Sequence, residues 1–210
     1  MRYRLAAFDF DGTLADSFGW FVDVMGEVAD RYGFRRVGVA ELETLRGYDA
    51  RRMLRHLGLP LWKVPLVAGH ARRLQARDID RITLFDGIGE MLRCLARGGV
   101  VVAVVSSNSE QNVRRVLGEE HAALVSRYGC GASLFGKRAK LKAVLRSAGV
   151  RPADAIYVGD EVRDIEAAKG LGMASGAVSW GYATPGALKA CSPTEVFDSP
   201  GELAGRLLGA

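Results

Sequence analysis

Four short apolar runs stand out along the chain, none with the polar alternation of a half-exposed strand: Leu5–Phe10, Val100–Val105, Ile156–Val158 and Ala177–Trp180. Segments with the apolar spacing of helices lie between them, at residues 88–95, 141–145 and 163–169. Apolar strands of this kind are typical of a parallel sheet that helices cover on both faces. The alternation predicts an α/β fold with an open, doubly wound, Rossmann-like sheet.

One segment, residues 17–83, breaks this alternation. It contains three stretches with helical spacing and no convincing strand: Phe18–Tyr32, Met53–Leu57 and Trp62–Arg77. We therefore expect a small all-helical domain at 17–83, inserted directly after the first strand. The core domain would consist of residues 1–16 and 84–210.

Composition excludes several functional classes. Of the 210 residues 49% are hydrophobic and 25% charged, an ordinary globular balance. The net charge of +5 comes from scattered basic residues, so we expect no nucleic-acid partner. No run of 18 apolar residues and no leader-like start occurs, which predicts no membrane partner and a cytoplasmic location. Three widely spaced cysteines indicate neither a disulfide framework nor a zinc site.

A pair of carboxylates, Asp9 and Asp11, ends the first apolar run, followed by Gly12 and Thr13. Residues two apart in a strand point the same way, so both carboxylates should reach one spot. Two carboxylates so close repel each other, and a bound Mg²⁺ relieves that repulsion. One carboxylate can attack phosphorus, and the other can move a proton. The alternatives are a plain Asp-Gly turn or a calcium loop, but an EF-hand would need glutamate where Trp20 stands.

A polar run, Ser106, Ser107 and Asn108, follows the second strand. A hydroxyl and backbone N–H groups at the start of a helix suit phosphate oxygens. Alternatively, Ser106 only caps the next helix.

A lysine, Lys137, opens a later helix, with Lys140 one turn on as its competitor. A cation here could offset the charge of a carboxylate and a phosphoryl group, although such a lysine is often only solvated. The spacing from Gly131 to Lys137 is close to a P-loop, but Arg138 stands where that motif needs Ser or Thr.

Acidic residues also follow the third strand, at Asp160, Glu161 and Asp164 after Gly159. They suit a cation, or merely a helix N-terminus. The carboxyl ends of parallel strands form the ligand-binding edge of open α/β sheets, so these features should meet there. Together they predict a magnesium-dependent phosphoryl-transfer site.

In order along the chain, four motifs resemble those of the haloacid dehalogenase-like hydrolase superfamily: Asp9-Phe10-Asp11-Gly12-Thr13-Leu14, Ser106, Lys137 and Gly159-Asp160-Glu161-x-x-Asp164. The resemblance implies that Asp9 is the nucleophile and Asp11 the general acid and base. It implies Mg²⁺ at Asp9, the Asp11 backbone carbonyl and Asp160, supported by Asp164 or Glu161. It assigns Ser106 and Lys137 to the phosphoryl group. The expected substrate-side residues are Gly12, Thr13, Ser107, Asn108 and Arg46.

The helical segment 17–83 is similar to the mobile cap of that family, and Arg46 lies in what looks like its inward-facing loop. The segment 178–188 is similar to phosphoglycolate phosphatase-like members, although it could simply cover a sheet edge. The presence of Asp11 favours a phosphatase over a dehalogenase, because dehalogenase members lack this aspartate.

The resemblance implies a phosphatase that acts on a small phosphorylated metabolite through an aspartyl-phosphate. Three alternatives stay open: a phosphomutase of this fold, a phosphonate hydrolase using Lys63 for a Schiff base, and a non-catalytic binding protein. The substrate is not encoded in the motifs, and either a monomer or a homodimer is expected.

Overall fold

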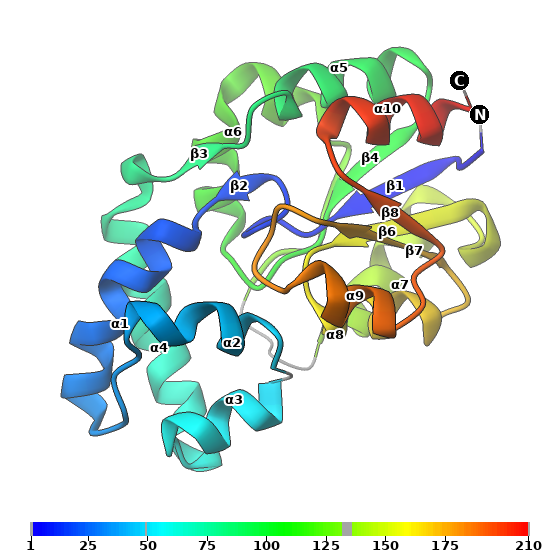
Figure 1. Ribbon diagram of the computed structural model, residues 1–210. Helices are drawn as coiled ribbons and strands as arrows, with labels where there is room; N and C mark the ends of the chain where they lie inside the picture. The colour runs from blue at the N-terminus through cyan, green and yellow to red at the C-terminus, as the bar shows by residue number, and fades with distance from the viewer. Residues whose placement is uncertain (1, 49, 132–135, 210) are drawn as a thin grey trace.

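The computed structural model describes residues 2–48, 50–131 and 136–209. Figure 1 shows a sheet flanked by helices and a further group of helices beyond one end of that sheet. The strands are β1 (Leu5–Phe8), β2 (Ala15–Asp16), β3 (Thr83–Leu84), β4 (Val101–Val104), β5 (Arg127–Tyr128), β6 (Ala155–Gly159), β7 (Ala174–Val178) and β8 (Glu195–Phe197). The helices are α1 (Phe18–Tyr32), α2 (Leu42–Arg46), α3 (Ala50–Leu57), α4 (Val64–Arg77), α5 (Ile88–Arg97), α6 (Glu110–Leu124), α7 (Lys137–Ala148), α8 (Val162–Lys169), α9 (Pro185–Ala190) and α10 (Pro200–Leu208).

Six strands form one sheet in the order β5-β4-β1-β6-β7-β8, and each neighbouring pair is parallel. The first strand lies in the middle, with Leu5 paired to Val101 on one side and to Ala155 on the other. The chain thus winds outward from β1 in both directions, which confirms the predicted doubly wound α/β fold. It also brings the carboxyl ends of β1, β4 and β6 together.

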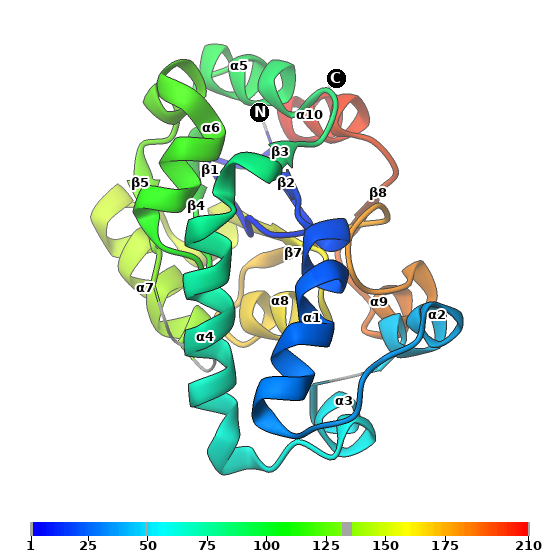
Figure 2. The same cartoon turned by 90° about the vertical axis from the view of Figure 1, so that its left-hand side faces the viewer.

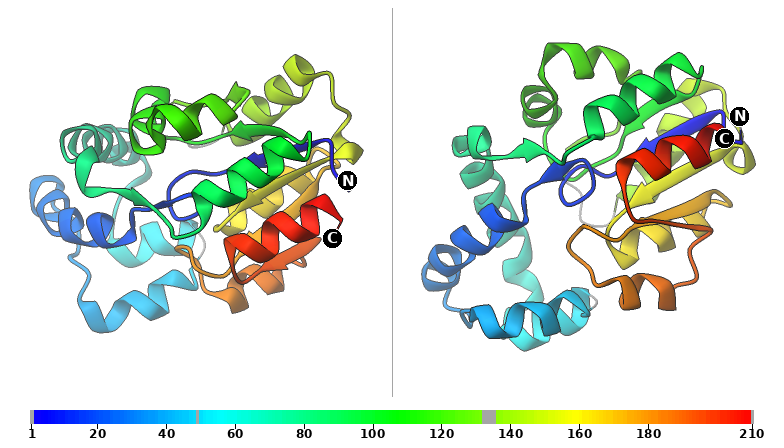
Figure 3. Two further views of the ribbon diagram at one scale, coloured as in Figure 1. Left: turned by 90° about the horizontal axis from the view of Figure 1, so that it is seen from above. Right: turned by 45° about the horizontal axis from the view of Figure 1, so that its top comes forward.

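Side chains of β1 alternate between the two faces of the sheet. Ala6 and Phe8 join the larger apolar cluster, which contains residues of α5, α6 and α10. Leu5 and Ala7 join a second cluster, with residues of α7 and α8. Figure 3 shows α5 and α10 lying side by side over one face. Burial on both faces explains why the strand sequence lacks alternation.

The predicted ends of two strands were wrong. The first strand ends at Phe8, because the Phe10 carbonyl accepts the backbone N–H groups of Thr13, Leu14 and Ala15 and so closes a turn. The fourth predicted strand is β7, which ends at Val178, while Trp180 lies in the turn that follows.

Two strands of the six-stranded sheet were not predicted. One of them, β5, has only two residues, too few to show a pattern. The other, β8, carries a buried glutamate, Glu195, which makes the segment look polar. Arg2 and Arg206 form ion pairs with Glu195 and make its burial tolerable.

The helices α1–α4 form what we call the helical insert, residues 17–83, beyond the carboxyl ends of the central strands (Figure 1). Figure 2 shows α1 and α4 side by side, while α2 lies to their right, beside α9. The antiparallel strands β2 and β3 join the insert to the core, a pairing that the sequence did not reveal. The third predicted helix starts later than expected, because residues 61–63 form a 3-10 turn.

None of the helices in residues 2–48, 50–131 and 136–209 combines the length and apolar character needed to cross a lipid bilayer. The two ends of the chain lie close together, on the side of the molecule opposite the helical insert (Figure 1).

Candidate active site

A glycine turn after β1 presents both aspartates at the end of the sheet. Gly12 has a φ of 77°, a conformation that favours glycine. A Cβ atom at this position would lie 2.2 Å from the Asp160 Oδ2 atom and 2.6 Å from the Tyr182 ring. Glycine is therefore required both by the backbone conformation and by the close approach of Asp160.

Lys137, the first residue of α7, reaches into the site, and its side chain is buried. Its Nζ atom donates to Asp9 Oδ2 at 2.5 Å and also forms an ion pair with Asp164. Burial by itself would lower the pKa of Lys137, but Asp164 and Asp9 outweigh it and raise this pKa. The competing Lys140 donates instead to the Ser106 carbonyl at 2.7 Å, so Lys137 is the lysine that contacts Asp9.

Three buried carboxylates, Asp9, Asp160 and Asp164, have oxygen atoms within 4.8 Å of one another. Thr13 Oγ1 donates to Asp160 Oδ1 at 2.7 Å, and the Tyr182 backbone N–H donates to Oδ2 at 2.8 Å. Burial, followed by the nearby carboxylates, raises the pKa of Asp160 well above its usual range. The cluster combines three carboxylates with one lysine. Carboxylate oxygens are hard donors, so the cluster fits a divalent cation such as Mg²⁺.

The side chains of Glu161 and Asp164 have different surroundings. Asp164 belongs to the three-carboxylate cluster and accepts the Glu161 backbone N–H at 3.0 Å. The Glu161 side chain is part of the capping box of α8 and pairs with Arg163. The Glu161 carboxylate therefore already has its hydrogen-bond partners at the start of α8.

Asp11 has a different environment, although it is only two residues from Asp9. Its half-buried carboxylate accepts Gln75 Nε2 at Oδ1 (2.6 Å) and Asn108 Nδ2 at Oδ2 (3.2 Å). Burial, and then the charge of Asp9, raise the pKa of Asp11 to about 6. The two carboxylates are close enough for the charge of Asp9 to act on Asp11, but they have different hydrogen-bond partners. The Asp11 side chain is not part of the three-carboxylate cluster, so the predicted metal ligand at this residue is its backbone carbonyl.

The polar run after β4, residues 106–108, reaches Asp11 through Asn108. Ser106 is buried, and its hydroxyl accepts the Asn108 N–H at 3.1 Å. The alternative that Ser106 caps α6 was wrong, because Ser109 is the N-cap and accepts the Asn112 N–H. Ser107 is half-buried in the bend between them. Of this run, Asn108 contacts Asp11 directly, and Ser106 in turn accepts the Asn108 N–H.

A loop after β7, residues 180–182, packs against the site. The sequence also allowed that this segment only covers the edge of the sheet. Trp180 Nε1 donates to the Thr13 carbonyl at 3.1 Å, and the Tyr182 hydroxyl lies 2.9 Å from Ser17 Oγ. A Cβ atom on Gly181 would lie 2.1 Å from the Cβ atom of Asp160. The glycine between Trp180 and Tyr182 is the sequence signal for this close packing against Asp160.

Arg46, at the end of α2, bridges the insert and this loop. Its Nε atom donates to the Tyr182 carbonyl at 2.9 Å, and Nη2 donates to the Gly181 carbonyl at 2.8 Å. The Thr184 N–H in turn donates to the Arg46 carbonyl at 3.2 Å. Contact with substrate remains a prediction. Lys63, the phosphonate-hydrolase candidate, donates to the Tyr32 carbonyl inside the insert at 2.8 Å.

Gln75 of α4 was missed entirely from the sequence. It is 7% exposed, and its helix was predicted, but periodicity does not tell which polar residue of an amphipathic helix faces another element.

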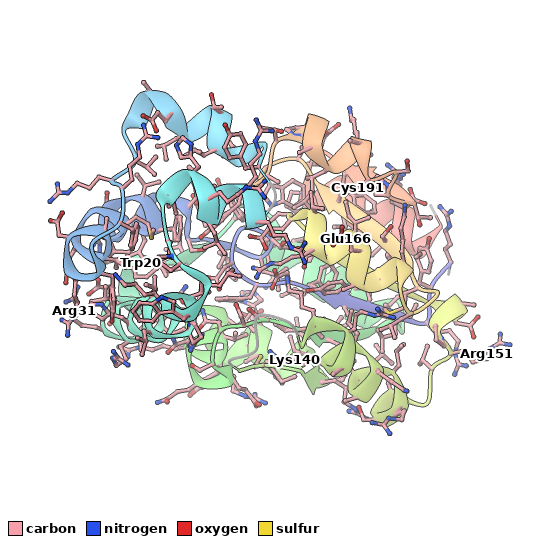
Figure 4. All side chains as sticks on the ribbon, turned by 90° about the horizontal axis from the view of Figure 1, so that it is seen from below. Trp20, Arg31, Lys140, Arg151, Glu166 and Cys191 are labelled. Atoms are coloured by element: carbon pink, nitrogen blue, oxygen red, sulfur yellow. The ribbon has the colours of Figure 1, made fainter. Side chains whose placement is uncertain are left out.

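Figure 4 looks onto the molecule with Trp20 and Arg31 marking α1 on one side, and with Lys140 of α7 and Glu166 of α8 on the other.

Comparison with known proteins places this geometry in context. The family model described as haloacid dehalogenase-like hydrolase matches residues 6–178. The chain is 31% identical over 197 residues to a protein named phosphoglycolate phosphatase from Synechococcus elongatus, covering 93% of each. It is also 31% identical over 188 residues to tyrosine-protein kinase PtkA from Mycobacterium tuberculosis, covering 85% of this chain and 63% of that one. A haloacid dehalogenase-like hydrolase from Streptococcus pneumoniae has the same fold, with a TM-score of 0.81 and 18% identity over 98% of each chain.

Proposed function

The chain belongs to the haloacid dehalogenase-like hydrolase family, and we propose that it is a magnesium-dependent phosphatase that cleaves a small phosphorylated metabolite through an aspartyl-phosphate on Asp9. The observation that carries the proposal is the geometry at the end of β1. Asp9 contacts the buried Lys137, while Asp11, two residues away, is held by neutral amides.

The first step transfers the phosphoryl group to the enzyme. The Asp9 carboxylate attacks phosphorus, the ester P–O bond breaks, and the departing oxygen takes a proton from Asp11. With its pKa raised to about 6, the Asp11 carboxyl keeps a useful protonated fraction near neutral pH. In this proposal Lys137 and Ser106 hold the phosphoryl oxygens, whose charge must be offset throughout the transfer.

The second step returns the enzyme to its starting state. Asp11, now a carboxylate, accepts a proton from water while the water oxygen attacks phosphorus. The P–O bond to Asp9 breaks, and inorganic phosphate leaves. One group acts first as acid and then as base, so the proton balance closes over a turnover.

Asp9, Asp160 and Asp164 would hold the metal ion, together with the Asp11 backbone carbonyl. When bound, Mg²⁺ supplies positive charge that offsets the phosphoryl oxygens and the clustered carboxylates. Thr13 and the Tyr182 N–H fix both oxygens of Asp160 and so orient it toward the cluster.

The helical insert, residues 17–83, acts in this proposal as a cap over the site. It brings Gln75 to Asp11, and Arg46 ties it to the loop 180–182. A cap excludes water from the first step and selects the substrate. The names of the relatives make phosphoglycolate the first compound to test, but two relatives at the same identity carry different activities.

The test is phosphate release from a panel of phosphate monoesters that includes phosphoglycolate and p-nitrophenyl phosphate, with Mg²⁺ or with EDTA. We expect turnover only with the metal, and its loss in Asp9→Asn with the fold retained. Full turnover by Asp9→Asn would remove the nucleophile assignment. Isomerised sugar phosphate in place of free phosphate would indicate a phosphomutase. No turnover of any ester would favour a binding protein.

A further inference from the structure

The carboxylate of Asp11 is held at both oxygen atoms by amide groups from two different parts of the molecule. Asn108, after β4, donates to Oδ2 at 3.2 Å, and Gln75, on α4 of the insert, donates to Oδ1 at 2.6 Å. Two donors at fixed positions restrict rotation of the carboxylate, which sets where its proton can be delivered.

The core amide has its orientation fixed from behind. The Ser109 N–H (2.8 Å) and Asn112 Nδ2 (3.0 Å) both donate to Asn108 Oδ1, so the Nδ2 group of Asn108 must face Asp11. This part of the arrangement lies wholly within one loop and α6. It does not depend on where the insert lies.

The insert amide is different, because Gln75 is a polar side chain in a buried position of α4, 7% exposed. Its neighbours on that helix, Val67 and Leu74, are buried apolar residues. A buried amide costs free energy unless it is hydrogen-bonded, and an apolar residue would pack here without that cost. The hydrogen bond to Asp11 gives the physical reason for a glutamine at this position.

From this geometry we infer that Gln75 is a positioning residue, which completes the placement of Asp11 as proton donor only when the insert packs against the core as it does here. The inference rests on the proposed function. Its chemical consequence is specific. Proton delivery matters for a leaving alkoxide, which is a strong base, and matters little for p-nitrophenolate, which leaves without a proton.

The experiment compares kcat/KM of wild type and Gln75→Met on phosphoglycolate, an alkyl phosphate, and on p-nitrophenyl phosphate. Methionine keeps the length and burial of the side chain but cannot donate. Because kcat/KM reports only steps through departure of the first product, the later hydrolysis of the aspartyl-phosphate does not enter. We expect a loss of about tenfold on the alkyl ester and less than about twofold on the aryl ester.

Two further variants complete the design. Arg73→Met introduces the same residue at an exposed position of the same helix, and we expect it to leave both rates unchanged. In an Asp11→Asn background, Gln75→Met should cause no further selective loss on the alkyl ester, because it acts through Asp11. Thermal unfolding of each variant checks that the fold is retained.

Equal losses on the two esters, or no loss on either, would overturn the inference, because Gln75 would then act on packing or binding alone. If wild type releases phosphate from neither ester nor from the wider panel, the proposed phosphatase function fails instead. The wild-type rates therefore separate the two failures before any variant is measured.

Discussion

Two regions meet at the end of β1 and surround their carboxylates in opposite ways. On the sheet side, Asp9 lies in a buried cluster with Asp160, Asp164 and the ammonium group of Lys137. On the insert side, Asp11 is held by neutral amides. The difference teaches how one short turn can give two carboxylates different environments, as the proposed roles of nucleophile and proton carrier require. Charge surrounds the first, while burial raises the pKa of the second.

The largest effect on this comparison should come from removing the cation on the sheet side. Lys137→Met leaves the buried carboxylates of Asp9 and Asp164 without their ion-pair partner, which typically costs about 3–5 kcal/mol of folding free energy. We expect phosphatase activity to fall by about a thousandfold or more, since charge neutralisation dominates phosphoryl transfer. Steady-state kinetics and thermal unfolding measure the two effects. Lys140→Met serves as the comparison, and an equal loss there would contradict the assignment of Lys137.

The next largest effect should come from closing the space between the two regions. In Gly12→Ala, a φ of 77° and a Cβ atom 2.2 Å from Asp160 Oδ2 force the turn or Asp160 to move. We expect a destabilisation of about 2 kcal/mol and a loss of activity of about a hundredfold.

The matched control is Gly19→Ala, an exposed position of α1 where a new Cβ atom meets nothing within 4 Å. Alanine in a helix should stabilise the protein there by about 0.5–1 kcal/mol and leave the rate unchanged. Denaturant unfolding and kinetics on both variants test the contrast. Similar results for the two glycines would show that the close approach of Asp160 has no functional weight.

A third prediction uses pH to sharpen the contrast between the regions. The pKa of Asp11 is raised from 3.8 to about 6, so the protonated form that donates to the leaving group is present below this value and is lost as pH rises through it. We expect kcat/KM on an alkyl phosphate to fall about tenfold per pH unit above pH 6. The same profile on p-nitrophenyl phosphate should stay nearly flat. Parallel profiles would contradict the role of Asp11 as acid.

The smallest effect should come from the residue that orients the core amide. Asn112→Ala removes one donor from Asn108 Oδ1 and leaves the Ser109 N–H in place. Loss of one such hydrogen bond costs about 1 kcal/mol, which corresponds to about a fivefold loss of kcat/KM on the alkyl ester. Kinetics on both esters measure it. A loss as large as that of Lys137→Met would mean that Asn112 does more than orient Asn108.

Much of the fold was predictable because burial leaves a direct pattern in the sequence. The runs that became β1, β4 and β6 are apolar on both faces and were found to within a few residues. The short strands β2, β3 and β5 were not, because two residues carry no periodicity. The ends of strands also escaped prediction, since hydrogen bonds to the Phe10 carbonyl decide where β1 stops.

The candidate site divides in the same way. Asp9, Lys137, Asp160 and Asp164 follow strands or open helices, and the parallel topology brings them to one edge. Gln75, Tyr182 and the backbone carbonyl oxygens that hold Arg46 come from loops and from an insert whose docking no local pattern encodes. Their contribution depends on contacts between residues far apart in the chain.

The sequence by itself determined that a carboxylate pair and a second acidic motif follow buried strands and that a lysine opens a later helix, because strand burial and turn residues are local properties. Only the tertiary structure decided that Asp9 and Asp11 face different partners, that Lys137 rather than Lys140 contacts Asp9, and that the insert reaches Asp11 through Gln75. Direction and distance between elements arise from packing, and packing is a property of the whole chain.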